Sequence, residues 1–125
     1  MADPDALRFL RIARADLQEA QRMLELSGFR VSSIGFLLQQ ACEKAFKSWI
    51  YSLGGVAPFT HDLVALMDWL KDSGVSLSAY GSLADLTFFA VQSRHDDNIA
   101  ITRPDWPILI RLASAPLDEV EDHLQ

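Results

Sequence analysis

Residues 34–51 read IGFLLQQACEKAFKSWIY, and this stretch decides the fold. Its apolar side chains recur at steps of three and four residues, the spacing of one face of an α-helix; they are Ile34, Leu38, Ala41, Ala45 and Trp49. A second series with helical spacing is polar and contains Gln40, Lys44, Lys47 and Tyr51. Glu43 lies one turn before Lys47, so the two side chains can pair. The stretch therefore predicts a helix with a broad core face and a polar seam, which suits either a pocket or interface or a solvated face with ion pairs.

The same spacing predicts helices on both sides of this stretch. The expected helices are Asp5 to Leu26, capped by Asp3 with Pro4 at the first position; Val31 to Leu53, ended by Gly54-Gly55; His61 to about Ser73, capped by Thr60; Ala79 to Arg94; and Pro104 or Asp105 to Leu124, with a kink or break near Ala115 because Pro116 follows. No segment indicates a sheet. The predicted fold is all-α, a four- to five-helix up-and-down bundle formed by a single domain over residues 1–125.

Composition excludes several classes of protein. The chain has 125 residues, half of them hydrophobic, which is enough for one domain with a core of its own. Its net charge of −6 argues against broad, nonspecific nucleic-acid binding. Cys42 is the single cysteine, so no intrachain disulfide can form, and its apolar neighbours indicate a core residue. We expect a cytoplasmic protein, because no apolar segment is long enough to span a membrane and no signal peptide is evident.

Histidines are the main candidates for chemistry, since no phosphate-binding glycine loop, zinc motif or cysteine pair occurs. The pair Gly54-Gly55 lacks the Lys-Ser/Thr of a P-loop. His61 lies at an expected helix start, where it is either a surface histidine or a functional one. His95 follows Arg94 and is either a cation favoured at a helix C-terminus or part of a phosphodiester site, in which histidine moves a proton and arginine holds phosphate.

Two motifs resemble the HEPN domain, a helical-bundle family named for its occurrence in higher eukaryotes and prokaryotes. They are Gln-Gln-Ala-Cys-Glu-Lys-Ala-Phe-Lys at 39–47 and Thr-His-Asp-Leu at 60–63. The resemblance implies a compact, mostly dimeric bundle. Many bacterial and archaeal members are encoded beside a minimal nucleotidyltransferase in toxin–antitoxin pairs, nucleotide binding was proposed for the group, and several branches are metal-independent RNases.

The RNase branches carry an arginine followed, after four to six residues, by a histidine, and this chain departs from that pattern. His95 follows Arg94 directly, so the two side chains diverge on a helix. We therefore expect a binding module without metal or cofactor. It would act as a homodimer with a separate nucleotidyltransferase and bind nucleotide or RNA through Arg94, His95, Lys44, Lys47 or His61. The alternatives are an RNase toxin that uses Arg94 and His95, and a structural assembly domain without a ligand. The adjacent Phe88 and Phe89 indicate the dimer interface.

Overall fold

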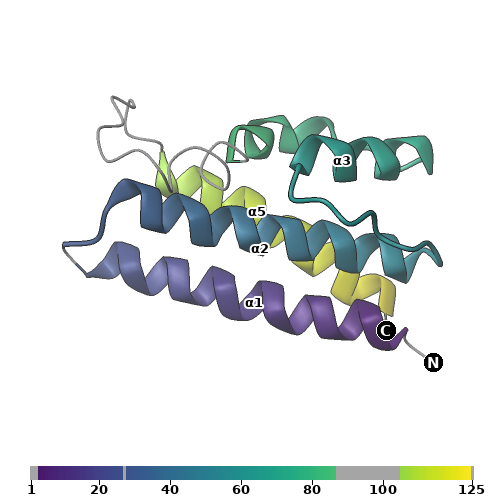
Figure 1. The fold of residues 1–125 in the computed structure, drawn as a ribbon, viewed down its shortest axis with the longest axis horizontal. Helices are drawn as coiled ribbons and strands as arrows, with labels where there is room; N and C mark the ends of the chain where they lie inside the picture. Colours follow the sequence, from purple (N-terminus) through teal and green to yellow (C-terminus); the bar gives the residue numbers. More distant parts are fainter. Residues whose placement is uncertain (1–2, 27, 87–104, 125) are drawn as a thin grey trace.

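The computed structural model describes residues 3–26, 28–86 and 105–124 (Figure 1). It contains the helices α1 (Pro4–Glu25), α2 (Val31–Ser52), α3 (Leu63–Asp72) and α5 (Trp106–Leu124), and the 3₁₀ helix η1 (Ser78–Leu86). None of these described residues forms a strand. The expectation of an all-helical bundle is confirmed. None of the described helices combines the length and the hydrophobicity needed to cross a membrane.

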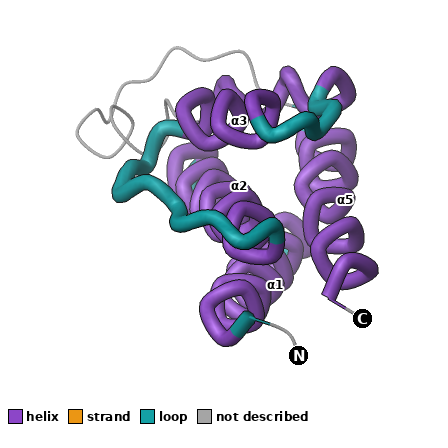
Figure 2. Tube along the Cα trace, turned by 90° about the vertical axis from the view of Figure 1, so that its right-hand side faces the viewer, coloured by secondary structure: helices purple, strands orange, loops and turns teal. Residues whose placement is uncertain are grey.

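Helix α2 is the centre of the bundle. It contacts α1, α3, α5 and η1. Figure 1 shows α1 and α2 side by side and antiparallel, and the end view in Figure 2 shows α3 and α5 on two further sides of α2. Helix α1 begins and α5 ends at the same end of the bundle. Because neighbours surround α2 on several sides, even polar residues on this helix become buried.

The core follows the spacing read from the sequence. All five apolar residues predicted for the α2 core face are buried, and Phe46 and Ile50 extend that face. Helix α1 contributes Ala6, Leu10, Ala13, Leu17 and Ala20. On the outer side of α1, Arg14 pairs with Asp118 and Glu121 and so ties α1 to α5.

The helix starts show one correct and one wrong prediction. Asp3 caps α1 as expected, because its carboxylate accepts the amide protons of Asp5 and Ala6. Helix α3, in contrast, is capped by Asp62 and not by Thr60. The Asp62 carboxylate accepts from the Val64 amide (3.0 Å), whereas the Thr60 hydroxyl accepts from the Asp62 amide two residues earlier, before the helix begins (3.1 Å). Thr60 thus stabilises the turn that precedes the helix, and α3 begins two residues later than predicted.

Two further predictions need correction. Of the kink or break expected near Ala115, the break is wrong: α5 continues through Pro116, which is buried. The segment after Ala79 is a 3₁₀ helix where it is described, not an α-helix. Its inward residues Tyr80, Leu83 and Leu86, together with Leu77 just before the helix, recur at every third position, the repeat of a 3₁₀ helix. The rest of that predicted helix, with Phe88, Phe89 and Arg94, lies outside the described residues, as does His95 after it.

Candidate functional site

A buried carboxylate organises the polar seam of α2. Glu43 is fully buried, and its Oε2 accepts hydrogen bonds from Lys44 Nζ (2.9 Å) and Lys47 Nζ (3.3 Å). Its Oε1 lies 2.7 Å from Nδ1 of His61, in the connection between α2 and α3. We call these four residues the Glu43 cluster. The cluster joins neighbouring turns of one helix to a loop that is 18 residues away in the sequence.

Electrostatics keep Glu43 ionised. Burial by itself raises the pKa of a carboxyl group, but hydrogen bonds from Lys44 and His61 and the charges of Lys44 and Lys47 outweigh that effect, so the pKa of Glu43 lies below its ordinary value. An ionised carboxylate can only accept hydrogen bonds, so Nδ1 of His61 carries a proton. Nε2 is then the nitrogen of His61 that is left to meet a ligand.

A second contact fixes the backbone of the same loop. Gln39, also fully buried, donates from Nε2 to the carbonyl oxygen of His61 (2.8 Å). Gln39 and Glu43 are one turn apart on α2, so one helix face holds both the backbone and the ring of His61. The Oε1 atom of Gln39 is buried and has no hydrogen-bond partner within the described part of the chain.

The members of the cluster reach solvent to different extents. The Lys47 side chain is 8% exposed, that of Lys44 is 22% exposed and that of His61 is 69% exposed. Asp16 of α1 lies near Lys44, and its pKa is raised, first by burial and then by the negative charge of Glu19. The cluster therefore lies largely in the core and is exposed to water at the imidazole of His61 and, in part, at Lys44.

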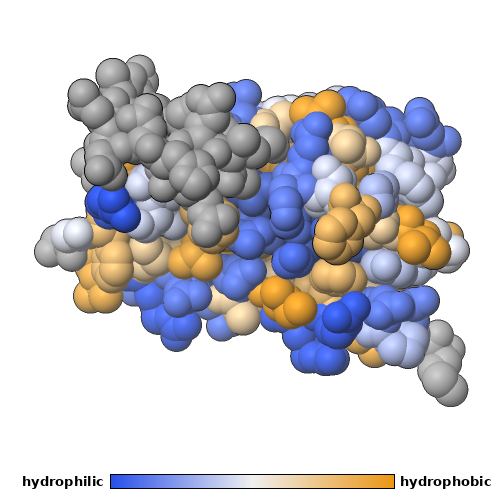
Figure 3. Space-filling view, in the orientation of Figure 1, coloured by the Kyte–Doolittle hydropathy of each residue, from blue (hydrophilic) through white to orange (hydrophobic). Residues whose placement is uncertain are grey.

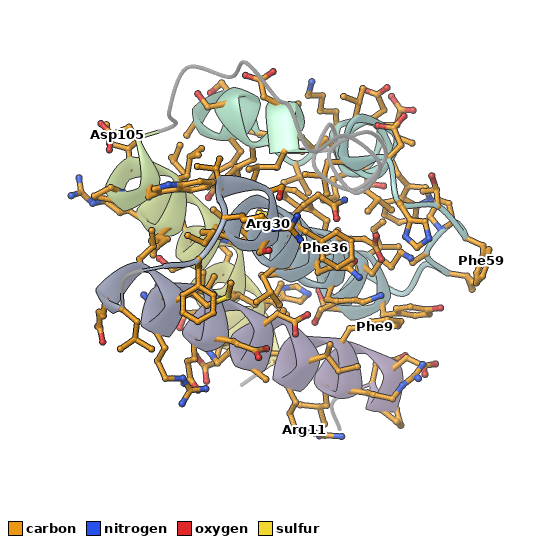
Figure 4. The ribbon with its side chains drawn as sticks, turned by 60° about the vertical axis from the view of Figure 1, so that its left-hand side comes forward. Phe9, Arg11, Arg30, Phe36, Phe59 and Asp105 are labelled. Carbon is orange, nitrogen blue, oxygen red and sulfur yellow. The ribbon has the colours of Figure 1, made fainter. Side chains whose placement is uncertain are left out.

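Aromatic rings flank the two lysines. The Phe9 ring stacks on Tyr51, with centroids 5.6 Å apart, and Lys44 Nζ lies 5.8 Å from the Phe9 centroid. On the other side, Lys47 Nζ lies 5.9 Å from the centroid of Phe59, which is fully exposed. Figure 4 shows Phe59 projecting from the α2–α3 connection, with Phe9 on the same side of the molecule. Cations and aromatic rings thus share one surface.

A groove of about 550 Å³ lies elsewhere, near the turn between α1 and α2. Its lining includes Met23, Leu26, Phe29 and Leu37, with Glu19 and Arg22 as the charged residues. Figure 3 shows hydrophobic residues, in orange, at this end of the molecule. None of the cluster residues lines the groove, so it is a separate feature.

Metal binding and thiol chemistry gain no support from the described residues. Among them, no three His, Cys, Asp or Glu side chains gather as a metal site. Cys42 is buried, and burial raises the pKa of its thiol to about 12, so the thiolate needed for nucleophilic attack does not form near neutral pH. The expectation that Cys42 is a core residue is confirmed.

The structure brings together Lys44, Lys47 and His61 of the predicted site residues, whereas Arg94 and His95 lie outside the described residues. Sequence reasoning missed the central role of Glu43, which it saw only as a partner for Lys47, and missed Gln39 and Phe59. A signal for the first two existed: Gln39 and Glu43 are one turn apart and lie between positions of the core face. Nothing in the sequence marks Phe59 as exposed.

Comparisons with known proteins agree with this arrangement of helices. The family model described as the HEPN domain matches residues 6–123, nearly the whole chain, and both motifs of the site fall inside the match. No curated protein and no solved structure gave a significant match. The central helix with the cluster and the Thr-His-Asp-Leu turn that meets it are therefore parts of a HEPN domain, and the chain belongs to the HEPN family.

Proposed function

We propose that this chain is a nucleotide-binding module and that the Glu43 cluster binds the phosphate groups. One observation carries the proposal: a single buried carboxylate holds two ammonium groups and one imidazole together at the solvent edge of the bundle. Preorganised cations of this kind bind phosphate, because the side chains are already ordered before the ligand arrives.

The charges and the free donors fit an anionic ligand. Lys44 and Lys47 bring two positive charges against the negative charge of Glu43, and the carboxyl group of Asp16, whose pKa is raised by burial, also lies near Lys44. Each ammonium group has three N–H donors, and one on each lysine is bonded to Glu43. The partly exposed Lys44 can present its other donors to a phosphate oxygen, whereas the buried Lys47 contributes its positive charge. In its doubly protonated form, the exposed imidazole of His61 also presents an Nε2–H donor beside them.

The working form that we propose is a homodimer acting with a separate minimal nucleotidyltransferase in a toxin–antitoxin-like pair, in the cytoplasm. The support is membership of the HEPN family, in which such pairs are common, and the two adjacent phenylalanines Phe88 and Phe89. Arg94 and His95 stay candidates for additional phosphate contacts. Light scattering at micromolar concentration should give twice the monomer mass of 14.0 kDa; a mass near that of the monomer contradicts the dimer.

Calorimetric titration with ATP and GTP in the presence of a chelator tests the binding site. We expect Lys44→Gln to weaken nucleotide binding about tenfold, since the variant loses one charged contact to phosphate. Lys71→Gln is the matched control, because Lys71 is an exposed lysine in the last turn of α3 and outside the cluster. Circular dichroism confirms that both variants fold.

Two results would overturn the proposal. The first is the absence of binding to the wild-type protein at millimolar nucleotide. The second is an equal loss in both lysine variants, which indicates nonspecific charge attraction. The same protein incubated with RNA in chelator tests the RNase alternative: cleavage that disappears in His95→Ala would replace the binding module by a nuclease.

A further inference from the structure

The side chain of Phe59 is exposed to solvent on the loop that connects α2 to α3. The ring is fully exposed, and the ammonium group of Lys47 lies over it. Phe9 differs, because one face of its ring already stacks on Tyr51 and the guanidinium of Arg8 lies 4.8 Å from its centroid. A flat apolar surface is therefore free for a ligand at Phe59 and not at Phe9.

The backbone on both sides of Phe59 is anchored. Before it, the Gly55 amide donates to the carbonyl oxygen of Ile50 (3.1 Å), and after it the Thr60 amide donates to the carbonyl oxygen of Pro58 (3.0 Å). The bond from Gln39 to the His61 carbonyl closes the segment two residues later. Since Pro58 also restricts its own φ angle, little backbone freedom is left to be lost when a ligand stacks on the ring.

The ring stands next to the phosphate-binding groups proposed above. Lys47 contacts both the Glu43 carboxylate and the Phe59 ring, and Phe59 is two residues from His61. Stacked aromatic rings beside a cationic surface are the usual arrangement for holding a base and its phosphate together. Stacking accepts any nucleobase, because each base has a π-face.

We propose that Phe59 is a stacking platform for a nucleobase whose phosphate groups bind at the Glu43 cluster. This inference rests on the proposed phosphate site and adds the second half of the ligand. The base and phosphate belong either to a free nucleotide or to single-stranded RNA, which present the same chemistry.

Titrations with inorganic triphosphate, ATP and a short oligoadenylate, all in chelator, separate the two halves of the site. Phe59→Ala should weaken ATP binding about tenfold and leave triphosphate binding unchanged, because stacking acts on the base alone. Phe59→Trp should keep the affinity for ATP and show quenching of the added indole. Val56→Ala is the control, since Val56 is another exposed apolar residue of the same connection.

Each outcome has a distinct meaning. If ATP and triphosphate both bind and Phe59→Ala binds ATP as tightly as the wild type, the stacking platform is refuted and the phosphate site stands. If neither ligand nor the oligonucleotide binds, the phosphate site and the platform fall together. Tighter binding of oligoadenylate than of ATP, lost in Phe59→Ala, supports the platform and identifies RNA as the source of the base; equal binding of the two supports the free nucleotide.

Discussion

Replacing Glu43 by methionine tests whether the cluster is held together as the structure indicates. Methionine keeps the length of the side chain but removes the acceptor of three hydrogen bonds. Lys44 and His61 can turn to water after the change, because both are partly exposed. Lys47 cannot do so without moving, since its side chain is only 8% exposed. The variant therefore strands one buried positive charge.

The expected loss follows from that stranded charge. Breaking a buried ion pair by removing one partner costs about 3–5 kcal/mol. The bonds lost by Lys44 and His61 are replaced by bonds to water, so they add about 1 kcal/mol together. We expect Glu43→Met to lower the free energy of unfolding by about 4 kcal/mol. Adding Lys47→Met removes the stranded charge, and the double variant should return to within about 2 kcal/mol of the wild type.

Urea unfolding at pH 7, followed by circular dichroism, measures all four members of this double-mutant cycle. Glu43→Gln belongs in the same series, because it keeps an acceptor for His61 and removes only the charge. A double variant that loses as much stability as the two single variants summed would refute the reasoning. So would a loss below about 1 kcal/mol in Glu43→Met, since such a loss is typical of an exposed pair.

Three more predictions follow from individual contacts. The ionised Glu43 carboxylate should stabilise the fold fully above pH 4.5, its ordinary pKa, and this stabilisation should disappear as the pH falls through the lowered pKa of the folded protein. The free energy of unfolding of the wild type should therefore fall more steeply below pH 4.5 than that of Glu43→Gln; equal pH dependence of the two proteins would contradict this. Gly55→Ala should cost about 1–3 kcal/mol by thermal unfolding, because the added Cβ would overlap the indole ring of Trp69; an unchanged Tm shows that the indole moves freely. At pH 8, Cys42 should react with a thiol reagent only as the protein unfolds, since its pKa of about 12 keeps it protonated; fast labelling of the native protein would show an open site.

The sequence predicted the fold because the apolar residues recur regularly at helical spacing and glycines follow the ends of the helices. It predicted the ends of the helices less accurately, because neighbouring side chains can accept similar capping hydrogen bonds. Thr60 and Asp62 both accept backbone amide protons, and only the structure shows which of them caps α3. A repeat of three residues after Leu77 suits an α-helix or a 3₁₀ helix, so periodicity alone did not separate the two.

The sequence predicted several residues of the site but not the contacts between them. Lys44 and Lys47 share a helix face, which follows from local spacing, and the Thr-His-Asp-Leu motif singled out His61. Their meeting at Glu43 depends on how the chain returns from the end of α2 to the start of α3, which is a tertiary contact without a local pattern. The exposure of Phe59 arises from the same return path.

Apolar residues of similar size would stabilise a small bundle about as well as a buried ionic cluster does. Apolar residues could not, however, hold the polar groups in these positions. Glu43 orients the ring of His61, Gln39 bonds the backbone of His61, and Lys47 lies between the Glu43 carboxylate and Phe59. The double variant Glu43→Met/Lys47→Met separates these two roles. If the cluster exists for ligand binding, that protein should be folded and nearly as stable as the wild type, yet unable to bind nucleotide. If the cluster only fastens the connection between α2 and α3, the same protein should bind nucleotide as the wild type does.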